Sequence, residues 1–256
     1  MHIGMIGGIG PAATEFYYHN LVKSYKSANE LLELTIVHAE LSDLRGNIVS
    51  NSPDKQAEIF RKLALRLQAA GAETIAITSI AGHFCIPEFE RISPLPIVNA
   101  IPALESELVK RGLQRVGILG NRISMETKLF GGISSTEVVV PLGQELDAVH
   151  NEYMKMATTG KVDSRQRELL FTIGKGLCER QGAEAVVLAG TDLFLAFDGH
   201  NSGFTVLDCA LVHIDALLGR SVQASTNKAM HSTNAGLRRY VCATQNHQLQ
   251  ALTLNR

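Results

Sequence analysis

Two stretches of the chain decide its fold class. Residues 67–79 read LQAAGAETIAITS, and residues 178–190 read CERQGAEAVVLAG. Each stretch ends a helical pattern, passes through Gly-Ala-Glu and continues into a short apolar run, which is typical of a strand buried on both faces. Gly71 and Gly182 are placed to end a helix with a positive φ angle. The repeated pattern predicts an α/β fold built from two pseudo-equivalent halves.

The same alternation of apolar runs and helical periodicity extends over most of the chain. The runs predict strands at residues 2–6, 34–38, 74–78, 96–99, 115–119, 137–140, 185–188 and 204–207, and helices at 12–24, 54–70, 101–111, 144–157 and 164–181. We expect two lobes, each a mostly parallel sheet flanked by helices. Residues 1–98 with 207–220 would form the first lobe, residues 99–206 the second, and residues 221–256 a polar C-terminal extension.

Composition excludes several function classes. The 256 residues carry 24 Lys plus Arg against 25 Asp plus Glu, a net charge of −1 without a basic block, so we expect no nucleic-acid partner. No apolar run approaches the roughly 18 residues of a membrane span. The first residues, MHIGMIGGIG, lack the basic and apolar regions of a signal peptide. We therefore predict a cytoplasmic protein with no membrane partner.

The cysteines point to free thiols. Cys85, Cys178, Cys209 and Cys242 are scattered and form no Cys-x-x-Cys pair. This spacing argues against a zinc site or a disulfide framework. We expect no bound metal.

A glycine-rich turn is the first candidate binding element. Residues 7–14 read GGIGPAAT and join a predicted strand to a predicted helix. Glycine N–H groups at a helix N-terminus can approach an anion, and proline suits the first helical turn. The spacing is not that of a dinucleotide-binding motif. Gly8, Gly10, Pro11 and Thr14 are therefore predicted contacts of a carboxylate or phosphate, with plain turn geometry as the alternative.

A second candidate follows the predicted strand at 74–78. Ligands in open α/β sheets bind beyond the carboxyl ends of strands, which would bring Ser79, His83 and Cys85 near a ligand as candidate catalytic residues. In the alternative interpretation Ser79 caps a turn and His83 is a buried structural histidine.

The corresponding strand end in the second half carries Gly190, Thr191 and Asp192. Thr191 is a predicted substrate contact and Asp192 a predicted cleft residue, although both could simply cap a following helix. Gly190 has no side chain for acid or base chemistry.

Four further residues are predicted substrate contacts. Asn121 and Ser124 lie in a polar loop after the strand predicted at 115–119. Arg45 and Lys161 are candidate partners of a carboxylate, with solvated surface positions as the alternative.

Taken in order, these segments resemble the aspartate/glutamate racemase family from residue 1 to about residue 218. Residues 6–14 with Tyr17 and Tyr18 are similar to the family's N-terminal motif. Residues 117–121 with Ser124 resemble its middle motif, and Asp208 with residues 213–216 its closing segment. The resemblance implies two lobes related by a pseudo-twofold axis, with a small acidic amino acid or dicarboxylate in the cleft between them. It also implies an isomerase reaction without pyridoxal phosphate or another cofactor, and a homodimer.

The sequence departs from that family at both catalytic positions. Ser79 aligns with the first cysteine and Gly190 with the second. Inversion needs two opposed proton-transferring groups, and serine is a far weaker base than a thiolate while glycine offers none. Standard two-cysteine racemisation is therefore not predicted.

Three hypotheses follow. The protein could bind a small acid with altered proton chemistry, in which His83 activates Ser79 or a displaced thiol, Cys85 or Cys209, acts instead. It could be a catalytically silent binding protein. It could also catalyse a lyase or decarboxylase reaction in the same cleft.

Overall fold

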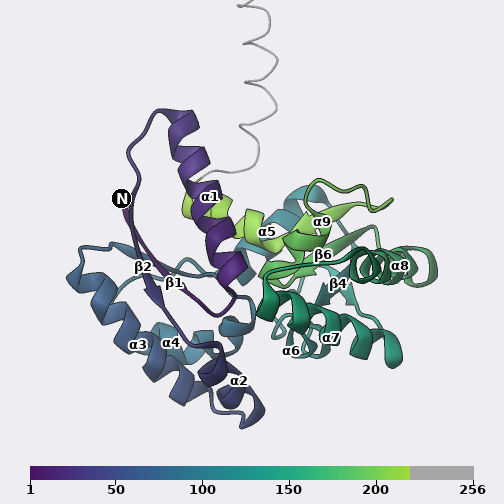
Figure 1. The fold of residues 1–256 in the computed structure, drawn as a ribbon, viewed down its shortest axis with the longest axis horizontal. Helices are drawn as coiled ribbons and strands as arrows, with labels where there is room; N and C mark the ends of the chain where they lie inside the picture. The colour runs from purple at the N-terminus through teal and green to yellow at the C-terminus, as the bar shows by residue number, and fades with distance from the viewer. Residues whose placement is uncertain (220–256) are drawn as a thin grey trace, which may run out of the picture. The chain divides into compact units, whose positions relative to one another are not determined.

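The computed structural model describes residues 1–219, where two parallel β-sheets alternate with helices (Figure 1). Residues 1–217 form one compact unit. The C-terminal extension predicted at 221–256 lies outside the described residues. The predicted α/β class with two parallel sheets is confirmed.

The first sheet has three strands. They are β1 (His2–Gly7), β2 (Glu33–His38) and β3 (Thr74–Ile77), in the order β2-β1-β3. The strand predicted at 96–99 is reduced to one parallel bridge between Ile97 and Ile75. Proline at positions 94 and 96 removes two backbone donors, which limits pairing there. Two hydrogen bonds remain, from Ile75 N to Pro96 O at 2.9 Å and from Val98 N to Ile75 O at 2.8 Å.

The second sheet repeats this arrangement with one more full strand. It contains β4 (Arg115–Gly120), β5 (Glu137–Val139), β6 (Ala185–Ala189) and β7 (Val206–Asp208), in the order β5-β4-β6-β7. β4 and β6 take the places of β1 and β3, and β7 takes the place of the Ile97 bridge. The common order supports the two pseudo-equivalent halves inferred from the repeated Gly-Ala-Glu pattern.

Five helices match the predicted ones. They are α1 (Pro11–Ala28), α3 (Pro53–Ala69), α5 (Ala100–Arg111), α7 (Gln144–Thr159) and α8 (Ser164–Gln181). α8 begins at a capping box in which Asp163 and Gln166 satisfy each other's backbone N–H. The predicted positive φ angles are present, 91° at Gly71 and 70° at Gly182.

Seven shorter helices were not predicted. They are α2 (Leu41–Val49), η1 (Ala81–Cys85), α4 (Ile86–Ile92), α6 (Arg122–Glu126), η2 (Thr191–Leu193), α9 (Phe194–Phe197) and α10 (Cys209–Leu217). Most follow the carboxyl end of a strand, where the chain turns away from the sheet.

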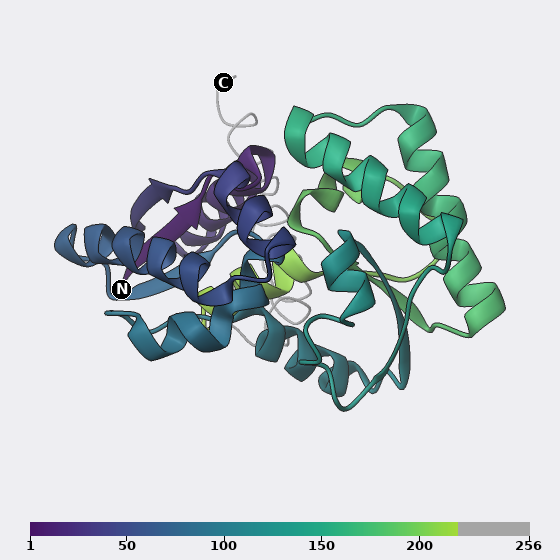
Figure 2. The ribbon, with the colours of Figure 1, turned by 90° about the horizontal axis from the view of Figure 1, so that it is seen from below.

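Each sheet packs against its own helices. β3 and β1 bury Ile6, Ile75 and Ile77 against Phe60 and Leu67 of α3. The core around β4 and β6 packs on α7 and α8, which lie side by side (Figures 1 and 2). Among residues 1–219, no helix combines the length and apolar character that a membrane crossing requires.

Helix α1 connects these cores through buried polar contacts. The Tyr17 hydroxyl donates to His213 Nδ1 of α10 at 2.9 Å, and His213 Nε2 donates to the Val98 carbonyl at 2.8 Å. Asn99, where we expected the second lobe to begin, caps α5 by accepting from Ile101 N at 3.0 Å.

Candidate functional site

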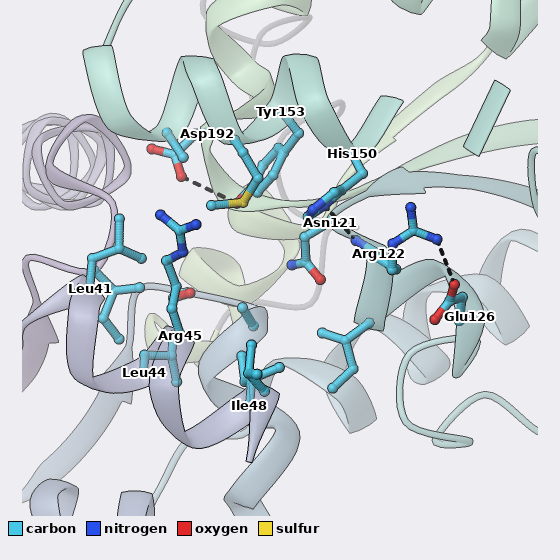
Figure 3. A pocket seen from close by; sticks show the side chains of 17 residues that line it. Leu41, Leu44, Arg45, Ile48, Asn121, Arg122, Glu126, His150, Tyr153 and Asp192 are labelled. Carbon is cyan, nitrogen blue, oxygen red and sulfur yellow. Dashed lines mark hydrogen bonds and ion pairs between the residues drawn. The ribbon is translucent and has the colours of Figure 1, made fainter. Parts of the chain in front are cut away.

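A pocket of about 370 Å³ lies where strands of both sheets end (Figure 3). Ile9 follows β1, Ser79 follows β3, Asn121 follows β4 and Asp192 follows β6. Helices α2, α6 and α7 complete the wall. Of the predicted site residues, the pocket brings together Ser79, Asn121, Asp192 and Arg45.

Asn121 lines this pocket, and its side-chain amide has an unused hydrogen-bond donor. Its side chain is 5% exposed, and its Oδ1 accepts from Ser124 N at 3.0 Å as the N-cap of α6. Its Nδ2 is buried without a hydrogen-bond partner, as is the hydroxyl of Ser124 behind it. Because buried polar atoms are nearly always paired, a free amide donor at a cavity indicates a place for a ligand acceptor.

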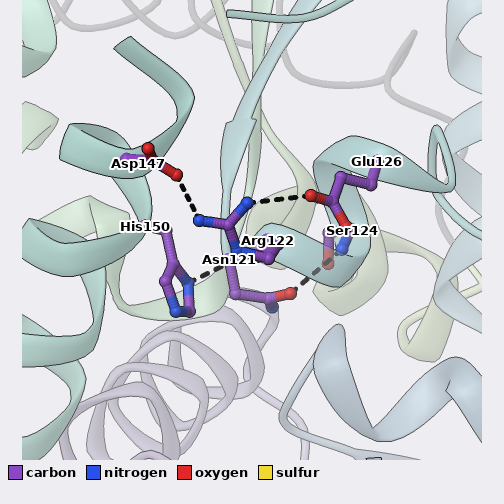
Figure 4. A network of polar contacts seen from close by, with 6 residues as sticks. All are labelled: Asn121, Arg122, Ser124, Glu126, Asp147 and His150. Atoms are coloured by element: carbon purple, nitrogen blue, oxygen red, sulfur yellow. Dashed lines mark hydrogen bonds and ion pairs between the residues drawn. The ribbon is translucent and has the colours of Figure 1, made fainter. Parts of the chain in front are cut away.

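His150 of α7 lies beside Asn121 and contributes a second donor (Figure 4). Its Nδ1 accepts from the backbone N–H of Arg122 at 3.1 Å, so the proton of the neutral ring is on Nε2. Burial lowers the pKa of His150, and the charges of Arg122 and Arg45 lower it further. The ring is therefore neutral at pH 7 and donates through Nε2.

The two arginines at the pocket differ in their pairing. The Arg122 guanidinium binds Glu126 at 2.9 Å and also pairs with Asp147 (Figure 4). Arg45, on α2, lines the pocket and has no ion pair with any residue from 1 to 219 (Figure 3). Arg45 is thus the cation available to a ligand.

The glycine-rich turn before α1 already holds a carboxylate, that of Asp192. Asp192 Oδ1 accepts from Ala13 N at 3.1 Å, and Oδ2 accepts from the Tyr153 hydroxyl at 3.3 Å. A Cβ at Gly10 would lie 2.5 Å from Asp192 Oδ2, so glycine is needed for this close approach. Burial raises the pKa of Asp192 to about 6, while the bonds from Ala13 and Tyr153 oppose that rise. The chain's own carboxylate therefore occupies the helix N-terminus where we had expected a ligand.

The rest of that turn is also internally bonded. Gly8 has a φ of 92°, and its N–H donates to Thr14 Oγ1 at 2.9 Å. The Thr14 hydroxyl donates to Gly10 O at 3.0 Å and lies 3.2 Å from Thr78 Oγ1. Pro11 opens α1 and has no N–H to offer. Gly8, Gly10, Pro11 and Thr14 thus build the wall behind Ile9.

Ser79 faces the pocket without an activating base. His83 donates through Nδ1 to the Ser79 carbonyl at 2.8 Å, and its Nε2 accepts from Ala100 N at 3.2 Å. Both ring nitrogens are occupied, so neither reaches the Ser79 hydroxyl. Burial lowers the pKa of His83 to about 3, with the nearby His213 ring as a second cause. This arrangement matches the alternative in which His83 is a structural histidine.

The side-chain position of Gly190 is filled by Tyr153. A Cβ at Gly190 would lie 2.4 Å from Cε2 of the Tyr153 ring. Tyr153 is buried, and burial together with the neighbouring Asp192 carboxylate raises its pKa well above the usual range. Tyr153 therefore occupies, as a neutral phenol, the place that the family resemblance gives to the second cysteine.

Two cysteines weighed as displaced thiols lie away from this pocket. Cys85 is fully buried, its thiol contacts Gly82 O at 3.4 Å, and burial raises its pKa to about 12. Cys209 opens α10 inside the core around β4 and β6, where burial and the adjacent Asp208 raise its pKa. Neither lines the pocket. Both behave as buried apolar residues.

The two remaining predicted substrate contacts, Lys161 and Thr191, do not line this pocket. Lys161 lines a separate surface cavity beside Glu152 and Asp163. The Thr191 hydroxyl donates to Thr78 O at 3.0 Å and so ties η2 to the end of β3. Within residues 1–219, no group of three or more His, Cys, Asp or Glu side chains is arranged to hold a metal ion.

Sequence reasoning missed His150 and Tyr153. They are spaced three residues apart on the helix predicted at 144–157, so they share a face. That spacing is equally typical of a core face, and nothing local marks this face as lining a pocket.

The chain is similar to known proteins over most of its length. The family described as Asp/Glu/hydantoin racemase matches residues 6–217. An aspartate racemase homologue from Pyrococcus horikoshii is 26% identical, with a TM-score of 0.71 over 85% of this chain and 97% of that one. The aspartate racemase of Picrophilus torridus is 19% identical, with a TM-score of 0.71 over 86% of this chain and 94% of that one. A glutamate racemase from Francisella tularensis, in complex with D-glutamate, is 15% identical, with a TM-score of 0.55 over 85% of this chain and 80% of that one.

Proposed function

The chain belongs to the Asp/Glu/hydantoin racemase family, and we propose that it binds a small acidic amino acid or related carboxylate without racemising it. The ligand carboxylate would accept from Asn121 Nδ2, and Arg45 would balance its charge. No cofactor takes part in this binding.

The free amide of Asn121 carries the proposal. A carboxylate oxygen at this position would satisfy a buried donor that otherwise has no partner. The Nε2–H of His150 and the Arg45 guanidinium are on the same pocket surface (Figure 3). Two neutral donors and one unpaired cation suit one carboxylate group.

The arrangement around Ser79 and Gly190 favours silent binding over altered proton chemistry. On the Ser79 side, His83 has no nitrogen free to accept the hydroxyl proton. On the Gly190 side, the Tyr153 phenol donates to Asp192 and is no base at neutral pH. The Asp192 carboxylate lies on the same side as Tyr153, so a second, opposed base is lacking among the described lining residues. No arrangement of these residues favours a lyase or decarboxylase reaction.

Calorimetry on the wild type and on Asn121→Asp tests this proposal. The probes are both enantiomers of aspartate and glutamate, with simple mono- and dicarboxylates. Asn121→Asp keeps the oxygen that accepts from Ser124 N but replaces the amide donor with a negative charge. Because a hydrogen bond to a charged group contributes about 1.5–3 kcal/mol, we expect affinity to fall by roughly tenfold or more.

Asn201→Asp is the matched control. Asn201 is exposed, its Oδ1 also accepts from a backbone N–H (Gly203, 3.0 Å), and it lies outside the pocket. It adds the same charge and should leave the affinity close to wild type. Equal affinity of the wild type and Asn121→Asp, or no binding of any probe, would contradict the proposal.

A homodimer remains a prediction from the family resemblance, and a cytoplasmic location remains a prediction from the sequence. Sedimentation equilibrium of the full chain tests the first, with a mass of two chains as the expected result.

A further inference from the structure

We infer that the pocket selects a monocarboxylate with a nonpolar side chain over a dicarboxylate. The inference rests on the proposed function, because it assumes that Asn121 and Arg45 hold one carboxylate. It concerns the part of the ligand that extends away from that group.

The pocket surface away from the donors is apolar. Helix α2 contributes Leu41, Leu44 and Ile48, whose spacing of three and four residues puts them on one face. Ile123 of α6 and Met154 of α7 add to the same wall. Figure 3 shows Leu41, Leu44 and Ile48 along α2, with Arg45 among them and Ile48 below Asn121. A ligand side chain in this space would leave water for an apolar surface.

The charges at the pocket suit only one ligand carboxylate. Arg122 is already paired with Glu126 and Asp147, which leaves Arg45 as the unpaired cation among the described lining residues. The remaining lining carboxylate, Asp192, would repel a second anion. Once the first carboxylate engages Arg45, a second carboxylate against the apolar side chains of α2 would lose its hydration without gaining a donor, which is costly.

The cavity has room for a short-chain acid. Its volume of about 370 Å³ is near the lower end of small-molecule pockets, which span roughly 300–1,000 Å³. A four- to six-carbon acid fits this description. The ligand could carry an α-amino group, for which Asp192 would be the acceptor, or lack one.

Calorimetry on the full chain with matched pairs of ligands tests this inference. Butyrate is compared with succinate, pentanoate with glutarate, and norvaline with glutamate, so that within each pair a nonpolar end replaces a carboxylate. Burial of one methylene contributes about 0.8 kcal/mol, so each added carbon from propionate to pentanoate should tighten binding by up to about fourfold. The nonpolar member of each pair should bind at least tenfold more tightly. A stronger response to norvaline than to pentanoate would identify an amino acid as the natural form.

Met154→Gln makes the wall polar with little change in side-chain length. It should weaken pentanoate binding at least threefold and leave glutarate binding unchanged. Leu65→Gln, on the exposed side of α3 and outside the pocket, is the control and should change neither.

The outcomes separate this inference from the proposed function. If succinate, glutarate or glutamate binds as tightly as its nonpolar partner and Asn121→Asp abolishes that binding, the inference is overturned while the proposed function stands. Binding of no probe overturns both. An affinity that does not rise with chain length also overturns the inference.

Discussion

The Tyr153 ring fills the space that a side chain at position 190 would occupy. The φ angle at Gly190 is −154°, which any residue adopts, so the backbone does not require glycine there. The requirement is steric, because the Tyr153 ring lies where a Cβ would be. A cysteine at this position and a tyrosine at 153 are therefore mutually exclusive without a shift of one of them.

Gly190→Ala should be destabilising for that reason. Overpacking of a closed site costs about 1–3 kcal/mol, and the free energy of unfolding from urea titration should fall by that amount. Gly46→Ala is the control, since nothing lies within 4 Å of its Cβ position in α2 and alanine favours a helix. If Gly190→Ala were as stable as Gly46→Ala, Tyr153 would not occupy the side-chain space.

The sequence predicts which residues follow the carboxyl ends of strands. Ser79, Asn121 and Asp192 were placed near a ligand because they follow strands, and all three line the pocket. The hydrogen-bond partners of these side chains could not be predicted from the sequence. The partner of Asp192 is Ala13, 179 residues away, and only the folded chain brings the two together.

At the scale of elements, the N-terminus of α1 has its cap supplied by another part of the chain. No side chain of the turn itself caps the helix, and Asp192 from η2 accepts from Ala13 N instead. A carboxylate at this end also complements the helix dipole. The family's N-terminal motif thus serves the packing of η2 against α1 in this chain.

Thr14→Val distinguishes a structural turn from a binding turn. Removing the hydroxyl leaves the Gly8 N–H without its acceptor, so the free energy of unfolding should fall by about 1–3 kcal/mol. Carboxylate affinity should stay close to wild type. Thr158→Val, an exposed threonine on α7, is the control and should alter neither. A loss of affinity as large as that of Asn121→Asp would show that the turn binds the ligand.

A helix can be predicted from the sequence when it has a long apolar face that packs into the core. α8 was predicted with its observed ends because its buried face is long and its caps, Asp163 and Gly182, are explicit. α2 was not predicted, since it has a single fully buried residue, Leu44. Its other apolar side chains line the pocket, so they produce no strong core periodicity.

In the whole molecule, four titratable groups act on stability in opposite directions, three of them buried and one, Asp208, half-buried. Burial lowers the pKa of His83 to about 3 and that of His213 to about 4. Burial raises the pKa of Asp192 to about 6 and that of Asp208 to about 7. Between pH 4 and 6 the unfolded chain holds more protons on the histidines and fewer on the aspartates. The histidines therefore make stability rise with pH, and the aspartates make it fall.

Asp192→Asn should expose this balance. The substitution removes one group that makes the free energy of unfolding fall as the pH rises. The opposite effect of His83 and His213 is then offset less, so the variant loses more stability in acid than the wild type. Relative to wild type, its free energy of unfolding should decrease by an additional amount of about 1 kcal/mol per pH unit on going from pH 6 to pH 4, because Asp192 is already half ionised at pH 6 in the folded protein. Urea titrations at pH 4, 5 and 6 measure both slopes. Parallel slopes would mean that Asp192 does not titrate in this window in the folded protein.

We propose that the chain keeps a carboxylate pocket of the racemase family but lacks its two opposed bases. Incubating the protein in deuterated water with each enantiomer of aspartate, glutamate and norvaline, and following the Cα proton by NMR, tests this proposal. We expect the Cα signal to persist for every enantiomer while calorimetry reports binding. Loss of the signal with inversion would contradict it by revealing two working bases, and loss without inversion would contradict it by revealing one, with Ser79 the first residue to substitute.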